Sequence, residues 1–474
     1  MKMQPVLVVD LDGTLIRTDM LHETFWSAFA KDWTTPLRAL AALGRGRAAL
    51  KQVLADRAAV DVATLPYDEG VLARLRDWRA QGGRTALVSA ADERLVAAVA
   101  AHLGLFNHAV GTTAGHNLKG EAKAARLVEL FGTDGFHYMG DAEVDLPVWR
   151  AAGAAITVNA PPDLQHRVTQ AVPGAEHLRT FTRSGRDYLR ALRPHQWLKN
   201  LLVFVPMLAA HDLTPFTALY ALTAFVAFSL IASSVYVLND LLDLGADRAH
   251  PRKCRRPFAS GAVPVAHGTA MAALLIGAGI VLAAPLGMGF VIVMAGYFGM
   301  TLAYSLYLKR RLVVDICALS TLYTFRILAG GAATALPISV WLLAFSVFFF
   351  FALAAVKRQA ELVDSAAAGG LGAHGRGYRV EDLPLVSMMA IAAGYVSVLV
   401  MALYASSDEV TRLYSAPHML WGICLVLLYW LSRMVMLTHR GRMHDDPVVF
   451  AVMDPVSRSC VIMVLALGIA GSLL

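Results

Sequence analysis

Two patterns of hydrophobic and polar positions divide the chain near residue 195. Before it, short apolar runs alternate with polar segments, and after it one long apolar block follows another. A helix that crosses a membrane needs ~20 consecutive apolar residues, and most of the blocks reach that length. The composition agrees, because 57% of the 474 residues are apolar, more than an ordinary soluble protein contains. We predict a soluble part and a membrane part with nine spans, at residues 199–211, 216–239, 264–284, 286–308, 312–334, 338–358, 383–405, 416–437 and 455–474.

The distribution of lysine and arginine predicts the orientation of these spans. Basic residues gather in the loops after the second, fourth, sixth and eighth blocks, whereas the alternate loops carry only Arg412. Cytoplasmic loops are enriched in lysine and arginine. We therefore predict a multi-pass protein of the bacterial inner membrane with its N-terminal part in the cytoplasm. This arrangement accounts for the net charge of +7 without a nucleic-acid partner.

The second span ends in a dense run of charge, NDLLDLGAD, from Asn239 to Asp247. On a continuous helix, Asp240, Asp243 and Asp247 fall within an arc of about 60°, and Asn239 borders that arc. Stacked carboxylates repel one another, and Mg²⁺, which takes oxygen ligands and bridges to phosphates, would relieve the repulsion. We predict a Mg²⁺ site on the three acids, with catalytic roles for Asp240 and Asp243. The simpler alternative, a solvated helix end, explains the basic residues that follow but not three stacked acids.

Further charged and aromatic side chains near the same membrane face suit a phosphate-bearing substrate. Several lie in "YSLYLKRRLVVDI", in "AAVKRQAELVDS" and in the glycine-rich "AAAGGLGAHGRGYRVEDL". Glycine-rich backbone beside arginine can wrap a phosphate, although a flexible loop has the same composition. Our substrate-binding candidates are Lys199, Asn239, Lys253, Arg256, Tyr304, Lys309, Asp315, Lys357, Arg358, Glu361, Arg376 and Tyr378. The acids of a fourth loop, Asp445, Asp446 and Asp454, suggest no role.

The pattern N-D-x-x-D-x-x-x-D at the end of a span resembles the UbiA superfamily of intramembrane prenyltransferases, over about residues 190–474. Most members with aromatic substrates have a second acidic motif, D-x-x-x-D, but here Asp315 is followed by Leu319 at its last position. The segments "RPHQWLKNLLVF", "HPRKCRRPFASG", "YSLYLKRRLVVDI" and "KRQAE" instead resemble the decaprenyl-phosphate phosphoribosyltransferase branch. That resemblance implies phosphoribosyl pyrophosphate as donor, a polyprenyl phosphate as acceptor, and Mg²⁺.

In the N-terminal part, short apolar runs lead into polar residues. "VLVV" precedes Asp10, "TALV" precedes Ser89, "FHYM" precedes Gly140 and Asp141, and "AAITV" follows. Buried strands that alternate with helices predict a doubly wound parallel sheet, whose site lies at the carboxyl ends of the strands. We expect an α/β Rossmann-like domain here and an all-α membrane domain after it.

The motifs "DLDGTL", Ser89, "LKGEAK" and "GDAEVD", in this order, resemble the phosphoserine-phosphatase-like branch of the haloacid dehalogenase (HAD) superfamily. The resemblance implies a second Mg²⁺ site and a helical cap at about residues 17–80. It implies that Asp10 is the nucleophile and Asp12 the general acid/base. It further implies that Ser89 binds the phosphate together with Lys119, for which Lys123 is a rival. The metal ligands that it implies are Asp10, Asp141 and the backbone carbonyl of Asp12, with Asp145 in support.

The two parts are joined by "RTFTRSGRDYLRALRPHQW", in which an apolar stripe and a basic stripe have helical spacing. This predicts an interfacial helix on anionic membrane lipids, with a plain amphipathic linker as the alternative. The predicted domains are therefore 1–178, a linker at 179–198, and 199–474.

Together the resemblances imply a bifunctional enzyme that makes polyprenylphosphoryl-5-phosphoribose and then removes its 5-phosphate, for cell-envelope biosynthesis. One alternative is a prenyltransferase that uses prenyl diphosphate and an aromatic acceptor. In that case the HAD domain would act on another phosphate or serve as a regulatory module. A transporter is a further alternative, and it predicts substrate movement without bond cleavage. The sequence is also compatible with a homo-oligomer.

Overall fold

The computed structural model describes residues 5–113, 117–370, 372, 376–443 and 446–473. The chain folds as two compact units. Unit 1 contains the residues up to Leu192 together with Tyr236–Ala273, and unit 2 contains Arg193–Val235 together with Leu274–Leu474. The end of the second apolar block, with its acidic motif, therefore belongs to the same unit as the N-terminal part.

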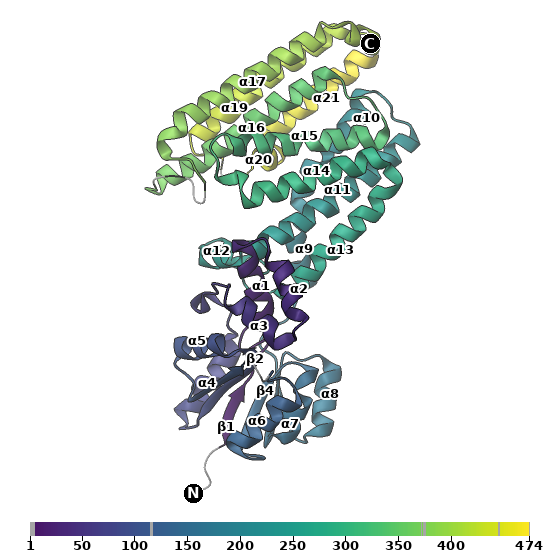
Figure 1. The fold of residues 1–474 in the computed structure, drawn as a ribbon. Coiled ribbons are helices and arrows are strands. Elements are labelled where there is room, and N and C mark those ends of the chain that lie inside the picture. The colour runs from purple at the N-terminus through teal and green to yellow at the C-terminus, as the bar shows by residue number, and fades with distance from the viewer. Residues whose placement is uncertain (1–4, 114–116, 371, 373–375, 444–445, 474) are drawn as a thin grey trace. The chain divides into compact units, whose positions relative to one another are not determined.

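Unit 1 is built on a six-stranded parallel sheet, which confirms the predicted doubly wound fold (Figure 1). The strand order is β3-β2-β1-β4-β5-β6, so β1 lies in the middle, between the strands that precede the second and fourth motifs. The strands are β1 (Val6–Val9), β2 (Thr85–Asp92), β3 (His108–Thr112), β4 (Phe136–Gly140), β5 (Ala154–Val158) and β6 (Glu176–Leu178). The central strands are buried, as their apolar runs predict.

Helices cover both faces of the sheet and form two separate cores. The face of Leu7 and Val9 packs against one pair of helices, and the face of Val6 and Val8 packs against the others. The first pair is α4 (Glu69–Ala80) and α5 (Glu93–Leu103), and the others are α6 (Glu121–Phe131), α7 (Leu146–Ala151) and α8 (Pro162–Ala171). This alternation along β1 leaves the carboxyl end of the strand open for a site.

Three helices between β1 and α4 occupy the region predicted to be a cap. They are α1 (Met20–Lys31), α2 (Thr35–Leu43) and α3 (Arg47–Ala55). Asp19 caps α1, because its carboxylate accepts hydrogen bonds from the backbone N–H groups of Leu21 and His22 at 2.8 and 3.2 Å. The loop after β1 therefore passes directly into the first helix of this region.

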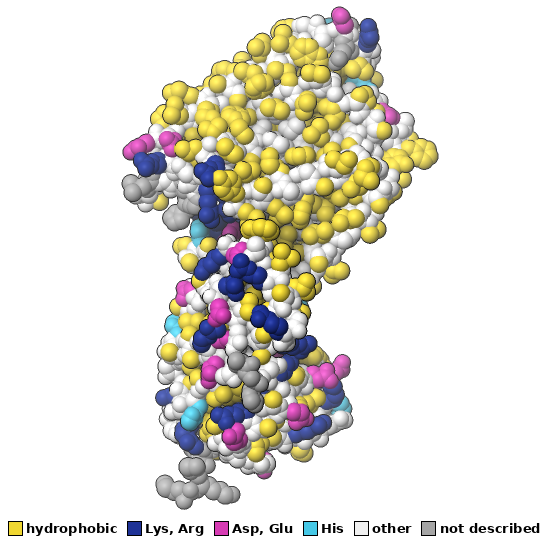
Figure 2. Space-filling model, in the orientation of Figure 1, with side chains coloured by type: hydrophobic (Ala, Val, Ile, Leu, Met, Phe, Trp, Pro, Cys, Tyr) yellow, Lys and Arg dark blue, Asp and Glu magenta, His cyan; other side chains and the backbone are white. Residues whose placement is uncertain are grey.

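Eight helices of the described chain are long and apolar enough to cross a membrane, and they follow the last eight predicted blocks. The corresponding segments are Pro215–Leu242, Val265–Leu286, Met288–Leu306, Val314–Thr334, Val340–Ala367, Val380–Ala405, Pro417–His439 and Pro455–Leu473. They contain α11 (Pro215–Leu242), α13 (Val265–Ala283), α14 (Met288–Leu306), α15 (Val314–Thr334), α16 (Val340–Ala367), α17 (Leu383–Ala405), α19 (Leu420–His439) and α21 (Pro455–Leu473). Hydrophobic side chains cover the visible surface of these helices (Figure 2), and Leu274 and Leu425 are more than 70% exposed. Such exposure is expected where lipid is the solvent.

The first predicted span, residues 199–211, is not a long helix. It lies in the 3₁₀ helix η3 (Pro194–Phe204), which runs into the short helix α10 (Val205–Ala209). These elements have 11 and 5 residues, and neither is among the eight candidate spans of the described chain.

A buried ion pair joins the cap to the segment that follows the acidic motif. The guanidinium of Arg248 donates to both carboxylate oxygens of Glu23, at 2.6 and 2.9 Å, and both side chains are at most 5% exposed. Glu23 also accepts a hydrogen bond from Thr18, and Trp26 donates to Thr269. These contacts make the cap and the 236–273 segment one packed body.

We expect Arg248→Met to destabilise the full-length protein by about 3–5 kcal/mol, because Glu23 would keep a buried charge without its partner. Differential scanning fluorimetry of the detergent-purified protein would measure the loss. Arg252→Met is the matched control, since Arg252 is exposed and close in sequence. The double variant Glu23→Leu/Arg248→Met should recover part of the stability, and a single variant that melts like wild type would contradict the prediction.

Candidate active sites

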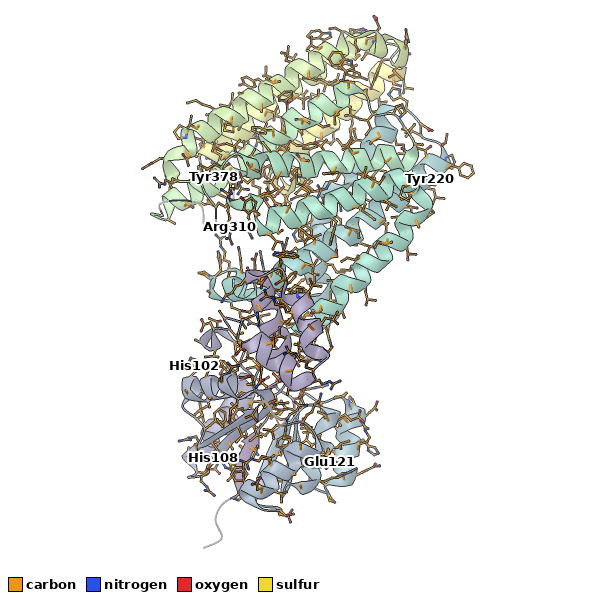
Figure 3. All side chains as sticks on the ribbon, viewed as in Figure 1. His102, His108, Glu121, Tyr220, Arg310 and Tyr378 are labelled. Carbon is orange, nitrogen blue, oxygen red and sulfur yellow. The ribbon has the colours of Figure 1, made fainter. Side chains whose placement is uncertain are left out.

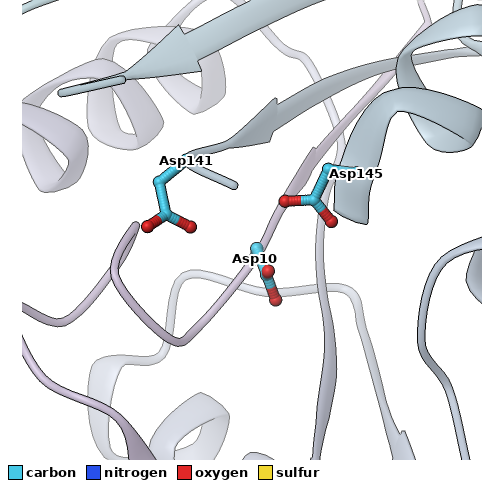
Figure 4. A group of neighbouring side chains, drawn as sticks. All are labelled: Asp10, Asp141 and Asp145. Atoms are coloured by element: carbon cyan, nitrogen blue, oxygen red, sulfur yellow. The ribbon is translucent and has the colours of Figure 1, made fainter. Parts of the chain in front are cut away.

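The site of the parallel sheet is a cluster of three carboxylates (Figure 4). Asp10 follows β1, Asp141 follows β4, and Asp145 opens α7. Oxygens of the three acids all lie within 4.8 Å of one another. Gly13 has φ +72° and faces Asp141 so closely that any side chain there would collide with the carboxylate. The glycine of "DLDGTL" therefore lets the loop after β1 approach the cluster.

Lys123 is buried within this cluster. Its ammonium lies 3.0 Å from Asp10 Oδ2 and 3.2 Å from Asp145 Oδ1, and it donates to Tyr138 Oη at 2.9 Å. Lys119 is exposed and lines the pocket beside the cluster. The sequence left these two lysines as rivals for one role, and the structure gives them different positions: Lys123 contacts Asp10, and Lys119 lines the pocket.

The residues fit a divalent cation. Burial raises the pKa of Asp10 to about 6, although the positive charge of Lys123 lowers it. Burial and the negative charges of Asp10 and Asp145 raise the pKa of Asp141 to about 8. Asp145 Oδ2 is buried without a hydrogen-bond partner among the described residues. Mg²⁺ held by Asp10 and Asp141, with Asp145 in support, would relieve this repulsion and polarise a bound phosphate.

We expect Mg²⁺ to stabilise the protein more at pH 8 than at pH 5.5. The raised pKa values of Asp10 and Asp141 mean that the metal-free fold binds protons that the unfolded chain releases, so its stability falls as pH rises from about 4 to 8. Mg²⁺ binds the ionised carboxylates and counteracts that loss, adding about 2.7 kcal/mol at 100 times its dissociation constant.

Melting temperatures with Mg²⁺ and with EDTA, at both pH values, would measure this difference. Asp141→Asn should remove most of the pH-dependent gain, while Asp77→Asn, on the exposed face of α4, should keep it. A Mg²⁺ effect of the same size at both pH values would contradict the assignment.

Asp12 lines the same pocket as Asp10. Asp12 Oδ1 accepts a hydrogen bond from the backbone N–H of Met20 at 2.8 Å, and burial raises the pKa of Asp12 well above its usual range. A protonated carboxyl group suits a general acid. Ser89 is fully buried inside β2, which extends to Asp92, and its Oγ accepts from the N–H of Ala91 at 3.0 Å.

A pocket of about 570 Å³ opens beside Asp10. The cap contributes Arg47, Leu50 and Lys51 to its lining, which sequence reasoning missed. The i, i+4 spacing of two basic residues on one cap helix was the available signal. Pro264 and His267, from the 236–273 segment, line it too.

The acidic motif of the membrane part lies at a break between two helices. The helix α11 ends at Leu242, Asp243 is non-helical, and α12 (Leu244–Ala249) follows. The helix is therefore interrupted where the sequence predicts a continuous one, although the N–H of Asp243 still donates to Asn239 O and that of Asp247 to Asp243 O. Asp240 and Asp247 still lie on one side, as the spacing predicts, because one guanidinium contacts both. Arg256 joins the two ends of the motif, since its guanidinium donates to Asp247 Oδ2 at 2.6 Å and to Asp240 Oδ1 at 3.1 Å.

The motif still fits a cation bound to oxygen ligands. Asp240 and Asp247 are at most 3% exposed, and burial raises the pKa of Asp247 although Arg256 opposes that shift. Asn239 Oδ1 is buried without a hydrogen-bond partner among the described residues. Arg256 supplies the positive charge between the two acids in this structure. Lys253 is exposed in the short helix η4 (Lys253–Arg255).

In unit 2 the structure brings together six of the predicted substrate-binding residues. Arg358 Nε lies 2.7 Å from Asp315 Oδ2, and both side chains are fully buried. Arg376 Nε lies 2.9 Å from Glu361 Oε2, and Arg376 also donates to Tyr304 Oη at 2.9 Å. The remaining contacts are Arg358 with Glu361 and Tyr304, and Tyr378 Oη with Asp315 Oδ1 at 2.6 Å.

This network ties the glycine-rich loop to the start of α15. The N–H of Val313 donates to Tyr378 Oη at 2.8 Å, and Val313 has φ +64°, a strained value for a β-branched residue. Tyr378 and Arg310 lie at the same end of the helices (Figure 3), and Lys309 is half-buried in η6 (Leu308–Arg310). Positions 371 and 373–375 of the loop lie outside the described residues.

Two further candidates, Lys199 and Lys357, converge on Asp446, which the sequence left without a role. Their ammonium groups lie 2.7 and 3.0 Å from the same oxygen, Oδ2. Tyr323 Oη donates to the same carboxylate at 3.2 Å. Burial opposes ionisation of Asp446, but the two lysines hold its pKa below its usual range. Only the fold could reveal this group, because its members lie on four separate segments.

Comparisons with known proteins identify a family for each of the two parts of the chain. The UbiA prenyltransferase family matches residues 200–453, and the haloacid dehalogenase-like hydrolase family matches residues 7–150. An uncharacterised protein, y4nM, of Sinorhizobium fredii is 39% identical over 95% of this chain and 88% of its own length. The nodulation protein NoeC of Azorhizobium caulinodans is 38% identical over 60% of this chain and 92% of its own.

A decaprenyl-phosphate phosphoribosyltransferase of Mycolicibacterium smegmatis is 43% identical over 180 residues. The match covers 37% of this chain and 56% of that enzyme. The similarity to this enzyme is therefore partial, whereas the similarity to the Sinorhizobium protein extends through both units.

Proposed function

Because the chain belongs to the UbiA prenyltransferase family and carries a haloacid dehalogenase-like hydrolase domain, we propose that it catalyses two consecutive reactions. The membrane domain transfers 5-phosphoribose from phosphoribosyl pyrophosphate to a polyprenyl phosphate. The HAD domain then removes the 5-phosphate from that product, which leaves polyprenylphosphoryl ribose. Both reactions take place on the cytoplasmic side of the bacterial inner membrane.

One observation carries the pairing of the two reactions. The phosphatase pocket is lined by Pro264 and His267, at the start of the membrane-spanning segment Val265–Leu286. Tyr188 of the linker helix α9 (Gly185–Leu192) contacts His267 through a hydrogen bond of 2.7 Å. A pocket that includes the beginning of a membrane helix suits a phosphate ester whose lipid remains in the membrane.

The membrane-domain reaction exchanges one bond at the anomeric carbon. The C1–oxygen bond to pyrophosphate breaks, and an oxygen of the lipid phosphate forms the new bond. That oxygen is already anionic, so the step needs positioning and charge stabilisation more than a base. Asp240, Asp243 and Asp247 would hold Mg²⁺, which neutralises the departing pyrophosphate, while Arg256 lies between two of the acids.

The HAD reaction breaks the phosphate ester in two steps. Asp10 attacks phosphorus to give an aspartyl-phosphate, and Asp12 donates a proton to the departing sugar oxygen. Water, deprotonated by Asp12, then hydrolyses the aspartyl-phosphate and releases inorganic phosphate. Ser89 and Lys119 contact the phosphate oxygens, and Lys123 keeps the Asp10 carboxylate oriented through its 3.0 Å contact.

A lipid-product assay tests the proposal. The detergent-purified protein would receive Mg²⁺, polyprenyl phosphate and phosphoribosyl pyrophosphate labelled in the ribose. We expect label to enter the lipid fraction as polyprenylphosphoryl ribose. A parallel reaction with prenyl diphosphate and an aromatic acid tests the alternative donor, and activity in that arm alone would overturn the proposal.

A further inference from the structure

Lys51 of the cap helix α3 is a half-buried cation without an acidic partner among the described residues. Its ammonium donates to two uncharged oxygens, the carbonyl of Ala90 at 2.5 Å and Asn117 Oδ1 at 2.8 Å. An ammonium group has three donors, so one remains for a ligand. Lys51 also lines the pocket beside Asp10.

A second cation accompanies it on the same helix. Arg47 lies four residues before Lys51, so the two side chains share one face of α3, and both line the pocket. Arg47 makes no ion pair in the part of the chain that the structure describes. Two apolar side chains, Leu50 of α3 and Leu43 of α2, line the same pocket. This wall combines two positive charges with apolar surface.

With Lys51 and Arg47, the pocket has more positive charges than a single phosphate bound at Asp10 requires. Lys119 and Lys123 already serve the scissile phosphate and the nucleophile, and Arg17 of the same pocket is paired with Asp68 at 3.2 Å. Ala90, to which Lys51 is bonded, directly follows Ser89. Lys51 therefore lies near the position of the phosphate that Asp10 attacks, but other cations already serve that phosphate.

The surroundings of Lys51 favour an anionic ligand. Burial lowers the pKa of Lys51, and the nearby Asp12 only partly offsets that effect. A partly buried ammonium bonded to neutral oxygens is stabilised by an anion within hydrogen-bond reach. The pocket volume of about 570 Å³ exceeds the space that a single phosphate fills.

We propose that Lys51, assisted by Arg47, binds a second phosphate group of the substrate, carried on the same sugar as the phosphomonoester that Asp10 attacks. The identification of that group as the phosphodiester of a lipid-linked sugar rests on the proposed function. The same chemistry would recognise a soluble sugar with two phosphates. The site thus selects against phosphomonoesters that carry no second charge.

Three probes test this subsite in the full-length protein. They are ribose 5-phosphate, the soluble 1-O-methylphosphoryl ribose 5-phosphate, and a short-chain polyprenylphosphoryl ribose 5-phosphate in detergent. The quantity measured is the preference, the ratio of kcat/KM for a diester-bearing probe to kcat/KM for ribose 5-phosphate. Lys51→Met should lower this preference at least 10-fold, mainly through KM, as expected for one charge-assisted contact. Lys51→Arg should retain most of it.

Arg45→Met is the matched control, because Arg45 is exposed just before α3 and does not line the pocket. Equal losses on all probes would mean that Lys51 only supports the fold or the scissile phosphate, which would overturn the subsite. A wild-type enzyme without any preference would overturn it too. If the soluble diester shows the Lys51 dependence but the lipid probe is not hydrolysed, the subsite stands and the lipid pairing fails. If the lipid probe is hydrolysed without Lys51 dependence, the lipid pairing stands and the subsite fails.

Discussion

Asp10→Asn should lower phosphate release from sugar phosphates by at least about 10³-fold, because Asp10 is the nucleophile that we propose and an amide cannot take that role. The same variant should still transfer label from phosphoribosyl pyrophosphate to lipid. We therefore expect polyprenylphosphoryl-5-phosphoribose to accumulate, where wild type gives polyprenylphosphoryl ribose. Thin-layer chromatography of the lipid fraction, before and after treatment with alkaline phosphatase, separates the two products.

The control for this variant is Asp77→Asn, a change of the same kind on the exposed surface of α4. It should give the wild-type product. If Asp10→Asn also yields the dephosphorylated lipid, another hydrolase in the preparation or another residue performs the second reaction. If the lipid product carries no 5-phosphate in either protein, the order of reactions that we propose is wrong.

Asp240→Asn should reduce transfer to the lipid by about 10²–10³-fold, the cost typical of removing one group that stabilises transition-state charge. The substitution keeps the size of the side chain but removes the charge that Arg256 contacts at 3.1 Å. Hydrolysis of soluble ribose 5-phosphate should continue, since Asp10, Asp141 and Asp145 form their own cluster. Loss of one activity with retention of the other would separate the two sites.

Glu381→Gln is the control for this second variant, because Glu381 is an exposed acid of the membrane domain. Its transfer rate should equal that of wild type. Full lipid labelling by Asp240→Asn would show that the acidic motif has no part in the transfer. Loss of both activities together would point to a folding defect, which size-exclusion chromatography of the variant detects.

Local patterns along the chain were sufficient for much of this organisation. The apolar runs predict nine spans, and eight of them are helices long enough to cross a membrane, because the length and hydropathy of a segment decide whether it can cross a bilayer. The short runs before Asp10, Ser89 and Asp141 predict a parallel sheet, and the sheet is parallel throughout its six described strands. Asp10 and Asp141 directly follow β1 and β4, whereas β2 extends beyond Ser89 to Asp92. Motif spacing led to both families for the same reason, since each motif is a continuous segment.

Partners that are distant in sequence could not be predicted in this way. Lys119 and Lys123 are nearly equivalent as sequence positions, but only Lys123 packs between Asp10 and Asp145. The convergence of Lys199 and Lys357 on Asp446 likewise depends on contacts across 247 and 89 positions. Ion pairs of this kind depend on where separate elements meet, and no periodicity in one segment contains that information.

Local backbone geometry was the second feature that could not be predicted from the sequence. The spacing of Asp240, Asp243 and Asp247 predicts one continuous helix, but the helix ends at Leu242. Asp240 and Asp247 still lie on one side, and the sequence pattern could not show that Arg256 lies between them. The first predicted span, residues 199–211, lies in the 3₁₀ helix η3 and the short helix α10 and forms no long α-helix. The sequence by itself thus determined which segments are apolar and which motifs they carry. The tertiary structure alone decided which charges meet, because buried charges are stable only where packing brings a partner to them.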